Sequence, residues 1–226
     1  MRVAVLFSGG KDSNLALYKA VQRGWKVKYL VSIISKNPES YMFHYPNIEL
    51  TQIQAKAMLI PIIKKETLGE KERELEDLKE VLSSIKNEID GIVSGAIESN
   101  YQKQRIDKIA EELGLKSLVP LWHEDSEKLW NEILNLGFEV IITGVFAEGF
   151  NKSWLGKKVD FKVLEELKKL NKKYKIHLFG EGGEFETFVL NGPLFKKKIK
   201  IIEDETIWKK DSGFYLIKKV KLVRKS

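Results

Sequence analysis

The order of apolar and polar positions along the chain predicts alternating strands and helices. An apolar run with β-branched members spans residues 2–8 and ends at a glycine pair, and a helical pattern then continues over residues 12–23 until Gly24. A second, nearly continuous apolar run over residues 26–35 is typical of a parallel strand that is covered on both faces. The chain is therefore expected to begin as strand, glycine turn, helix and strand.

The same alternation continues to about residue 120. Leu and Ile recur at three- and four-residue spacing between residues 75 and 89, which is the pattern of an amphipathic helix. The other elements expected here are strands at residues 61–67, 91–94 and 116–119 and helices at residues 48–59 and 106–113. This alternation predicts an α/β fold with a doubly wound parallel sheet, in which ligands bind at the carboxyl ends of the strands.

The rest of the chain predicts a second, smaller domain of mixed α+β structure. Its expected elements are helices at residues 126–136 and 161–174, a strand at residues 138–145, and short strands around Phe188, Ile201 and Tyr215. We therefore expect two domains, residues 1–119 and residues 120–226.

Composition narrows the class of protein. The 226 residues are 43% hydrophobic, which is enough for a substantial core, and the absence of Cys excludes disulfide scaffolds, thiolate zinc sites and cysteine nucleophiles. The sequence has no run of about 18 apolar residues, and its N-terminus leads into a glycine turn and not into a cleavage site. A cytoplasmic protein with no membrane partner is expected.

The net charge of +7 arises in the last part of the chain. Residues 191–226 contain eleven Lys or Arg and four Asp or Glu, and the two signs are balanced upstream. This excess favours either a docking surface for an acidic protein or RNA, or a solvated face of Lys-rich strands.

The clearest chemistry lies in a segment that we call the phosphate loop: Ser8, Gly9, Gly10, Lys11, Asp12 and Ser13. A strand that turns into a helix at a glycine pair gathers backbone N–H groups, hydroxyls and the positive helix end around one point, where an anion binds. The glycines allow a tight turn, Lys11 adds a cation, and Asp12 can hold Mg²⁺ directly or through water.

The spacing distinguishes this loop from two common nucleotide-binding motifs. A Walker A loop would need Gly in place of Val5 and Ser or Thr in place of Asp12, and a dinucleotide fingerprint would need Gly in place of Ser13. The segment instead resembles the PP-loop of ATP pyrophosphatases, which release pyrophosphate and carry their substrate as an adenylate. The alternative is an ordinary glycine turn before a helix.

A second segment, which we call the acidic glycine loop, spans residues 180–187. It places Glu181, Glu184 and Glu186 around a glycine pair. Crowded carboxylates repel one another and are stable beside cations, so this loop could hold Mg²⁺, ammonium or a cationic substrate, or supply a general base. The alternative is an exposed polar turn between strands.

Four blocks along nearly the whole chain resemble the diphthine–ammonia ligase family. They are the phosphate loop, residues 94–102 with Arg105, residues 120–122, and the acidic glycine loop with residues 193–195. The resemblance implies that the chain uses ATP and Mg²⁺ to adenylate diphthine, the modified histidine of translation elongation factor 2, and amidates it with ammonium, releasing AMP and pyrophosphate. It also implies an ATP-binding domain at residues 1–119, a substrate domain at residues 120–226 and no requirement for nucleic acid. The oligomeric state is left open, a homodimer included.

The resemblance also implies roles for individual residues. Catalysis is expected from Lys11, Asp12, Glu184 and Glu186, with Asp12 as metal ligand. ATP would be bound by the phosphate loop together with Ile33, Gly95, Ala96 and Ile97. The substrate would be bound by Tyr101, Gln102, Arg105, Trp122, Glu181, Gly182, Gly183 and Thr187.

Some of these residues also have a purely structural interpretation. Arg105 lies one helical turn beyond Tyr101 and could reach a phosphate or carboxylate, or form a surface ion pair. Tyr101 and Trp122 could offer π faces to the trimethylammonium group of diphthine, or could be core aromatics. No role is expected of the histidines, which show no metal-ligand spacing: His44, His123 and His177.

Two other functions stay open from the residues. The basic C-terminal segment favours a PP-loop enzyme that adenylates a tRNA base. A regulator that binds ATP without turnover would need the phosphate loop but neither Glu184 nor Glu186.

Overall fold

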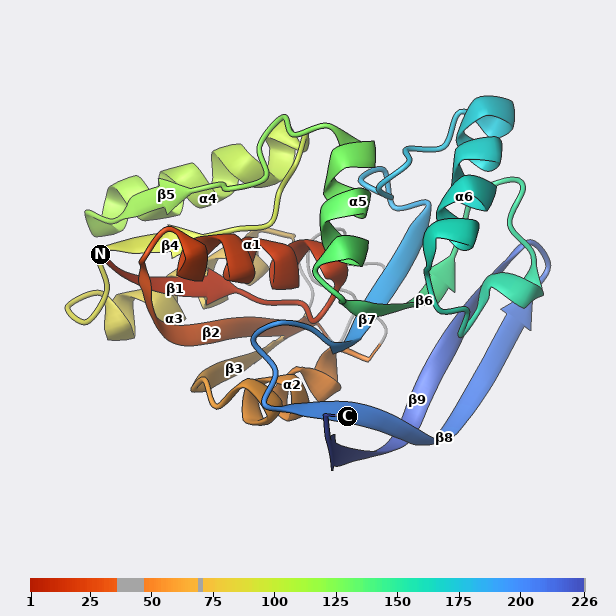
Figure 1. Ribbon diagram of the computed structural model, residues 1–226. Helices are drawn as coiled ribbons and strands as arrows, with labels where there is room; N and C mark the ends of the chain where they lie inside the picture. Colours follow the sequence, from red (N-terminus) through yellow and green to blue (C-terminus); the bar gives the residue numbers. More distant parts are fainter. Residues whose placement is uncertain (36–46, 69–70, 226) are drawn as a thin grey trace. The chain divides into compact units, whose positions relative to one another are not determined.

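The chain folds into two compact units, which are drawn in the computed structural model of Figure 1. The structure describes residues 1–35, 47–68 and 71–225. The first unit is Met1–His123 and the second is Glu124–Ser226. The division expected from the sequence, after residue 119, falls slightly earlier along the chain.

The first unit is built on a five-stranded sheet in which every pair is parallel. Its strands are β1 (Arg2–Leu6), β2 (Lys26–Ser35), β3 (Ile62–Thr67), β4 (Gly91–Val93) and β5 (Lys116–Leu118). They lie in the order β3-β2-β1-β4-β5, so the chain first builds from β1 to one edge and then from β4 to the other. This confirms the doubly wound α/β class and places the topological switch point between β1 and β4.

Helices cover both faces of this sheet. They are α1 (Lys11–Gln22), α2 (Thr51–Met58), α3 (Lys71–Ile85) and α4 (Asn100–Leu113), with a 3₁₀ turn at Ile48–Leu50. In Figure 1, α1 lies in front of the sheet, and α3 and α4 lie behind it. Between the sheet and these two helices lies a cluster of buried apolar side chains, which includes Ala4, Val31, Ile33, Leu78, Leu82, Ile92, Ile106 and Ile109. Burial of these side chains holds the sheet together and so fixes the loops at its carboxyl edge.

The second unit has the mixed α+β structure that the sequence predicts. Its helices and strands are α5 (Ser126–Asn135), β6 (Glu139–Val145), a 3₁₀ turn at Lys152–Trp154, α6 (Phe161–Tyr174), β7 (Phe185–Asn191), β8 (Lys197–Lys209) and β9 (Ser212–Arg224). The strands form an antiparallel sheet in the order β7-β6-β9-β8.

The expectation of short strands around Ile201 and Tyr215 is wrong. β8 and β9 each have 13 residues and form one long hairpin, seen in Figure 1. Two register shifts around Glu203 interrupt the alternation of inward- and outward-facing side chains, and many side chains on these strands are exposed. The pattern of apolar residues therefore reveals only part of each strand. The ladder of backbone hydrogen bonds continues through the segments that the pattern does not reveal.

Candidate active site

The phosphate loop joins the carboxyl end of β1 to the first turn of α1, beside the switch point of the sheet. Gly9 has a φ of 83°, in the left-handed region that residues with a Cβ rarely adopt. A Cβ at this position would also lie 2.5 Å from Gln54 Oε1. The turn therefore requires glycine here.

The first turn of α1 lacks a side-chain cap. Its N-cap is Gly10, whereas Ser99, Asp125 and Asp160 cap α4, α5 and α6 with a side-chain oxygen that accepts a backbone N–H. A first turn of this kind, at the positive end of the helix dipole, favours a bound phosphate.

Two amide side chains hold the loop from the protein side. Asn14 Nδ2 donates to the carbonyl oxygens of Gly9 and Gly10 at 3.1 and 2.9 Å, and Gln54 Nε2 donates to the Gly9 oxygen at 2.9 Å. Both amide side chains are buried, so these bonds keep the turn in one conformation. The sequence analysis missed both residues. Asn14 directly follows the motif and could have been noticed, but no signal in the sequence points to Gln54.

The polar side chains of the loop lie close together. Lys11 is 3% exposed and its Nζ lies 3.1 Å from Asp12 Oδ2, whereas the Asp12 side chain is 34% exposed. Ser8 Oγ lies 3.3 Å from Ser13 Oγ, which donates to the Gly10 carbonyl oxygen at 3.2 Å. The phosphate loop thus gathers a cation, an accessible carboxylate and two hydroxyls.

The residues after β4 lie against the same turn. A Cβ on Gly95 would lie 2.9 Å from the carbonyl carbon of Asp12 and 3.0 Å from the backbone nitrogen of Ser13. Ala96 and Ile97, which follow, are buried. The structure therefore places the segment 95–97 directly beside the phosphate loop, and only glycine fits at the point of contact.

Two aromatic rings, one on α4 and one in the turn after β5, each have a cation near them. The guanidinium carbon of Arg105 lies 3.5 Å from the centroid of the Tyr101 ring, and Lys103 Nζ lies 5.5 Å from that of the Trp122 ring. These four side chains are half-buried, as is Gln102 in the same turn. Neither ring is a fully buried core residue, and Arg105 covers one face of Tyr101.

In the second unit, the acidic glycine loop is folded around His177. Its Nδ1 accepts hydrogen bonds from the backbone N–H groups of Phe179 and Glu181, both at 3.2 Å. Its backbone N–H donates to Glu184 Oε1 at 2.6 Å. The sequence suggested no role for His177, but in the structure its ring accepts hydrogen bonds from the backbone of this segment.

The loop is also tied to the core of its unit. Phe179 and Trp130 are fully buried and meet edge to face, with ring centroids 5.2 Å apart, and Trp130 Nε1 donates to the Leu178 carbonyl oxygen at 2.9 Å. On the other side, the Phe146 N–H donates to the Glu184 carbonyl oxygen at 2.9 Å. These contacts make the loop a supported structure and not a loose surface turn.

One oxygen of the Glu184 carboxylate takes no part in these contacts. Oε2 is buried and has no hydrogen-bond partner among the described residues, whereas Oε1 accepts the His177 N–H. Gly182 lies close by, because a Cβ there would be 2.9 Å from Oε1 and 3.0 Å from Oε2. A buried carboxylate oxygen without a donor is costly, so this position favours a cationic or proton-donating ligand.

Three other residues with predicted roles lie on strands of the two sheets. Glu186 and Thr187 lie on β7, where they pair with β6, and Glu186 is half-buried. Ile33 differs from the other residues expected to bind ATP, because its side chain lies in the apolar cluster on the α3 and α4 side of the sheet.

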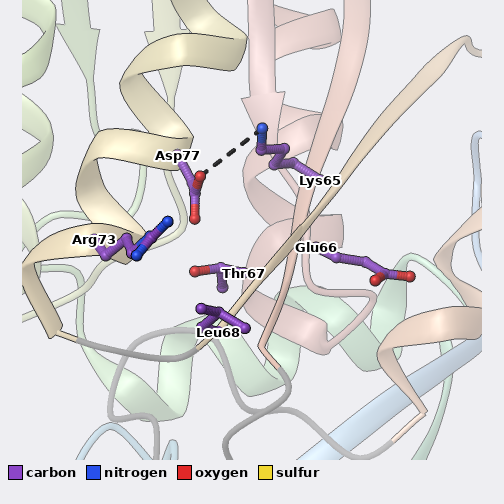
Figure 2. Close-up of a pocket in the computed structure, with 6 residues that line it drawn as sticks. All are labelled: Lys65, Glu66, Thr67, Leu68, Arg73 and Asp77. Atoms are coloured by element: carbon purple, nitrogen blue, oxygen red, sulfur yellow. Dashed lines mark ion pairs between the residues drawn. The ribbon is translucent and has the colours of Figure 1, made fainter.

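A cavity of about 250 Å³ opens at the carboxyl end of β3 in the first unit (Figure 2). It is lined by Lys65, Glu66, Thr67, Leu68, Arg73 and Asp77. Lys65 Nζ lies 3.8 Å from Asp77 Oδ1 and 3.0 Å from Glu80 Oε2, so its charge is balanced by carboxylates of α3. None of the residues expected to bind ATP or substrate lines this cavity.

Within residues 1–35, 47–68 and 71–225, no cluster of three or more His, Cys, Asp or Glu side chains is arranged to hold a metal ion. No helix in these ranges is long and apolar enough to span a bilayer.

Comparison with known proteins gives the same family for both halves of the chain. Sequence models of the diphthamide synthase N-terminal domain and of the diphthamide synthase C-terminal domain match residues 1–117 and 125–223. The diphthine–ammonia ligase of Bos taurus is 35% identical over 92% of this chain and 85% of its own, and that of Danio rerio is 35% identical over 95% and 91%.

Two further matches are weaker or cover less of the related protein. A diphthine–ammonia ligase of Schizosaccharomyces pombe is 33% identical over 98% of this chain but only 39% of its own length. A solved structure described as a predicted subunit of a tRNA methyltransferase from Methanocaldococcus jannaschii is 17% identical, with a TM-score of 0.46 over 85% of this chain and 97% of that one. The latter likeness supports no conclusion about function.

Proposed function

The chain belongs to the diphthamide synthase family, and from this premise we propose that it is an ATP-dependent diphthine–ammonia ligase. It adenylates the carboxylate of diphthine on translation elongation factor 2 and transfers the acyl group to ammonia, giving diphthamide, AMP and pyrophosphate. The observation that carries the proposal is the uncapped glycine turn at the switch point of the sheet, in a chain whose two halves both match this family. The proposed reaction is the same whether the chain acts as a monomer or as a homodimer.

In the first unit, the phosphate loop binds the phosphates of ATP. The uncapped first turn of α1 and the Lys11 ammonium group stabilise negative charge on the phosphates. Segment 95–97 lies against this turn and contacts the nucleotide, and Ile33 contributes through its backbone.

Asp12 and the loop hydroxyls fit a Mg²⁺ ion. In nucleotide sites Mg²⁺ is usually held by one or two carboxylates together with phosphate oxygens and water, so a single accessible carboxylate beside the phosphates is sufficient. Asp12, with 34% of its side chain exposed, offers this ligand. When bound, the ion neutralises charge on the departing pyrophosphate.

The reaction consists of two displacements. A carboxylate oxygen of diphthine attacks the α-phosphorus of ATP, and the bond from this phosphorus to the bridging oxygen breaks as pyrophosphate leaves. Ammonia then attacks the acyl carbon, and AMP leaves. Ammonium must first lose a proton, because its nitrogen has no free electron pair while all four protons are bound.

We assign the binding and deprotonation of ammonium to the acidic glycine loop. Glu184 Oε2 is a buried acceptor with no donor among the described residues, which suits an N–H of ammonium and then its proton. Glu186 is assigned as a second catalytic carboxylate because it lies two residues further along the same loop. The remaining loop residues assigned to the substrate are Glu181, Gly182, Gly183 and Thr187.

Recognition of the trimethylammonium group of diphthine is assigned to Tyr101 and Trp122. Both rings already have a cation near them, which supports their use as π faces. Arg105 covers one face of Tyr101, and the ring also packs against the apolar cluster of the first unit. Gln102, in the same helical turn, is assigned to the substrate on its position alone.

The proposal is tested by following AMP and pyrophosphate release from labelled ATP while one component is omitted at a time. The components are Mg²⁺, ammonium and elongation factor 2 that carries diphthine, and we expect AMP only when all are present. AMP that appears only with RNA would instead indicate a base-modifying enzyme. ATP binding without cleavage under every condition would indicate a regulator, and either result overturns the proposal.

Replacement of one carboxylate separates catalysis from nucleotide binding. Glu184→Gln keeps the shape of the side chain but removes the proton acceptor, so we expect turnover to fall by roughly 10²- to 10⁴-fold with ATP binding unchanged. Glu203→Gln, at an exposed carboxylate on β8, is the matched control and should leave turnover unchanged.

A further inference from the structure

We infer that His177 is a positioning residue, and that its imidazole, protonated on Nε2 only, sets the shape of the acidic glycine loop and so holds Glu184 in place. The effect on turnover rests on the proposed function, but the state of the ring does not. The inference concerns a side chain for which neither the motif nor the family comparison supplies a role.

The hydrogen bonds to the ring define its tautomer. Two backbone N–H groups, those of Phe179 and Glu181, point at Nδ1 from 3.2 Å. A ring nitrogen that accepts hydrogen bonds carries no proton, so the proton of the neutral ring is on Nε2. The imidazolium form could not accept either bond.

These two bonds bend the chain around the ring. Gly180 lies between the two donors with a φ of 73°, and its own N–H donates to the His177 carbonyl oxygen at 2.9 Å. A Cβ on Gly180 would lie 3.0 Å from the Phe185 carbonyl oxygen. The bend is therefore held on its inner side by the imidazole and on its outer side by the start of β7.

The same residue also holds the other end of the loop. The His177 backbone N–H donates to Glu184 Oε1 at 2.6 Å, and the Gly180 carbonyl oxygen accepts the N–H of Gly183 at 3.2 Å, one residue before Glu184. Loss of the bend at Phe179–Glu181 would thus displace the segment that carries the carboxylate. His177 touches no reacting atom in this account and acts through Glu184.

The alternative is that His177 merely fills space, and a pair of substitutions separates the two roles. His177→Asn places a side-chain oxygen near the position of Nδ1 and keeps an acceptor for the bend. His177→Phe keeps a ring of similar size but removes the acceptor. A packing role predicts that Phe is tolerated at least as well as Asn, and a positioning role predicts the reverse.

The first measurement needs no substrate. Nitrogen NMR of the full chain, labelled in histidine, should show an unprotonated Nδ1 and a protonated Nε2 for His177 at neutral pH, and amide exchange should show Phe179 and Glu181 protected. In His177→Phe both amides should lose protection, and in His177→Asn they should keep most of it. A proton on Nδ1, or unprotected amides in the wild-type chain, would overturn the inference even if the Phe variant failed to fold.

The second measurement is turnover. We expect His177→Phe to lower kcat by roughly thirtyfold, the equivalent of two neutral hydrogen bonds, with the Kd for ATP unchanged, and His177→Asn to stay within about threefold of wild type. A folded Phe variant with wild-type kcat would refute the positioning role and leave the ligase proposal intact. A wild-type chain that shows the expected tautomer but never forms AMP would refute the ligase proposal and leave the tautomer assignment intact.

Discussion

Replacement of Gly95 by Ala would test how closely the residues after β4 and the phosphate loop depend on each other. The new Cβ would lie 2.9 Å from the Asp12 carbonyl carbon and 3.0 Å from its oxygen and from the Ser13 nitrogen. All three atoms belong to the backbone of the first turn of α1, so no side chain can rotate to relieve the contact. The turn would have to move from 2.9 Å to ordinary contact at about 3.4 Å.

The expected cost follows from this displacement. Overpacking of this kind costs about 1–3 kcal/mol. If the strain falls on the N–H groups that face the phosphates, ATP binding should weaken by roughly 5- to 150-fold. Isothermal titration calorimetry with ATP and Mg²⁺ measures the affinity, and urea unfolding measures the stability.

Gly91→Ala, at the first residue of β4, supplies the matched control. Its Cβ would lie 2.9 Å from the Lys116 carbonyl oxygen and 3.0 Å from Leu118 Cδ1, which is similar crowding away from the phosphate loop. Both variants should lower the free energy of unfolding, but only Gly95→Ala should weaken ATP binding. Equal loss of affinity in the two variants, or wild-type affinity in Gly95→Ala, would refute the reasoning.

Three further predictions concern stability. Leu59 follows α2 with a φ of 60°, which is strained for a residue other than glycine, and its side chain is 75% exposed. Leu59→Gly should therefore raise the free energy of unfolding by about 1 kcal/mol in urea titrations. An unchanged free energy of unfolding would show that this backbone conformation is not strained. Trp130→Phe removes the buried bond to the Leu178 carbonyl oxygen and should cost about 1–3 kcal/mol by the same assay; an unchanged midpoint would argue against it. Hydrogen bonds from Arg2 lower the pKa of Asp90 from 3.8 to about 2, so the stabilisation is present above pH 3.8 and is lost as pH falls toward 2. Asp90→Asn should therefore be less stable than wild type at neutral pH and converge with it near pH 2, whereas a constant difference across pH would refute this.

Local patterns were sufficient to predict most of the fold. Residues 26–35 and 75–89 are the clearest cases, because a nearly continuous apolar run and an amphipathic stripe each depend only on neighbours in the chain. The hairpin of β8 and β9 was underestimated because its strands are held by backbone pairing as well as by an apolar face.

The candidate site could be predicted only in part, for a related reason. The phosphate loop is contiguous, so its glycines and charges are visible in the sequence. Its support from Gln54 joins residues 45 positions apart, and the bond between Trp130 and Leu178 joins residues 48 apart. His177 lies close to its loop in sequence, but its role depends on which ring nitrogen faces the backbone, which no pattern of residue types encodes.

The strand order of the first unit has a consequence for synthesis of the chain. β1 leaves the ribosome before β2 and β4, yet it lies between them in the sheet, and β4 begins only at Gly91. A nascent chain that ends before that residue has a phosphate loop with one side unsupported, because the contact at Gly95 has not been made. Nucleotide affinity should thus arise only after the residues that follow β4 have left the ribosome, and ATP then stabilises only chains in which this pairing has formed.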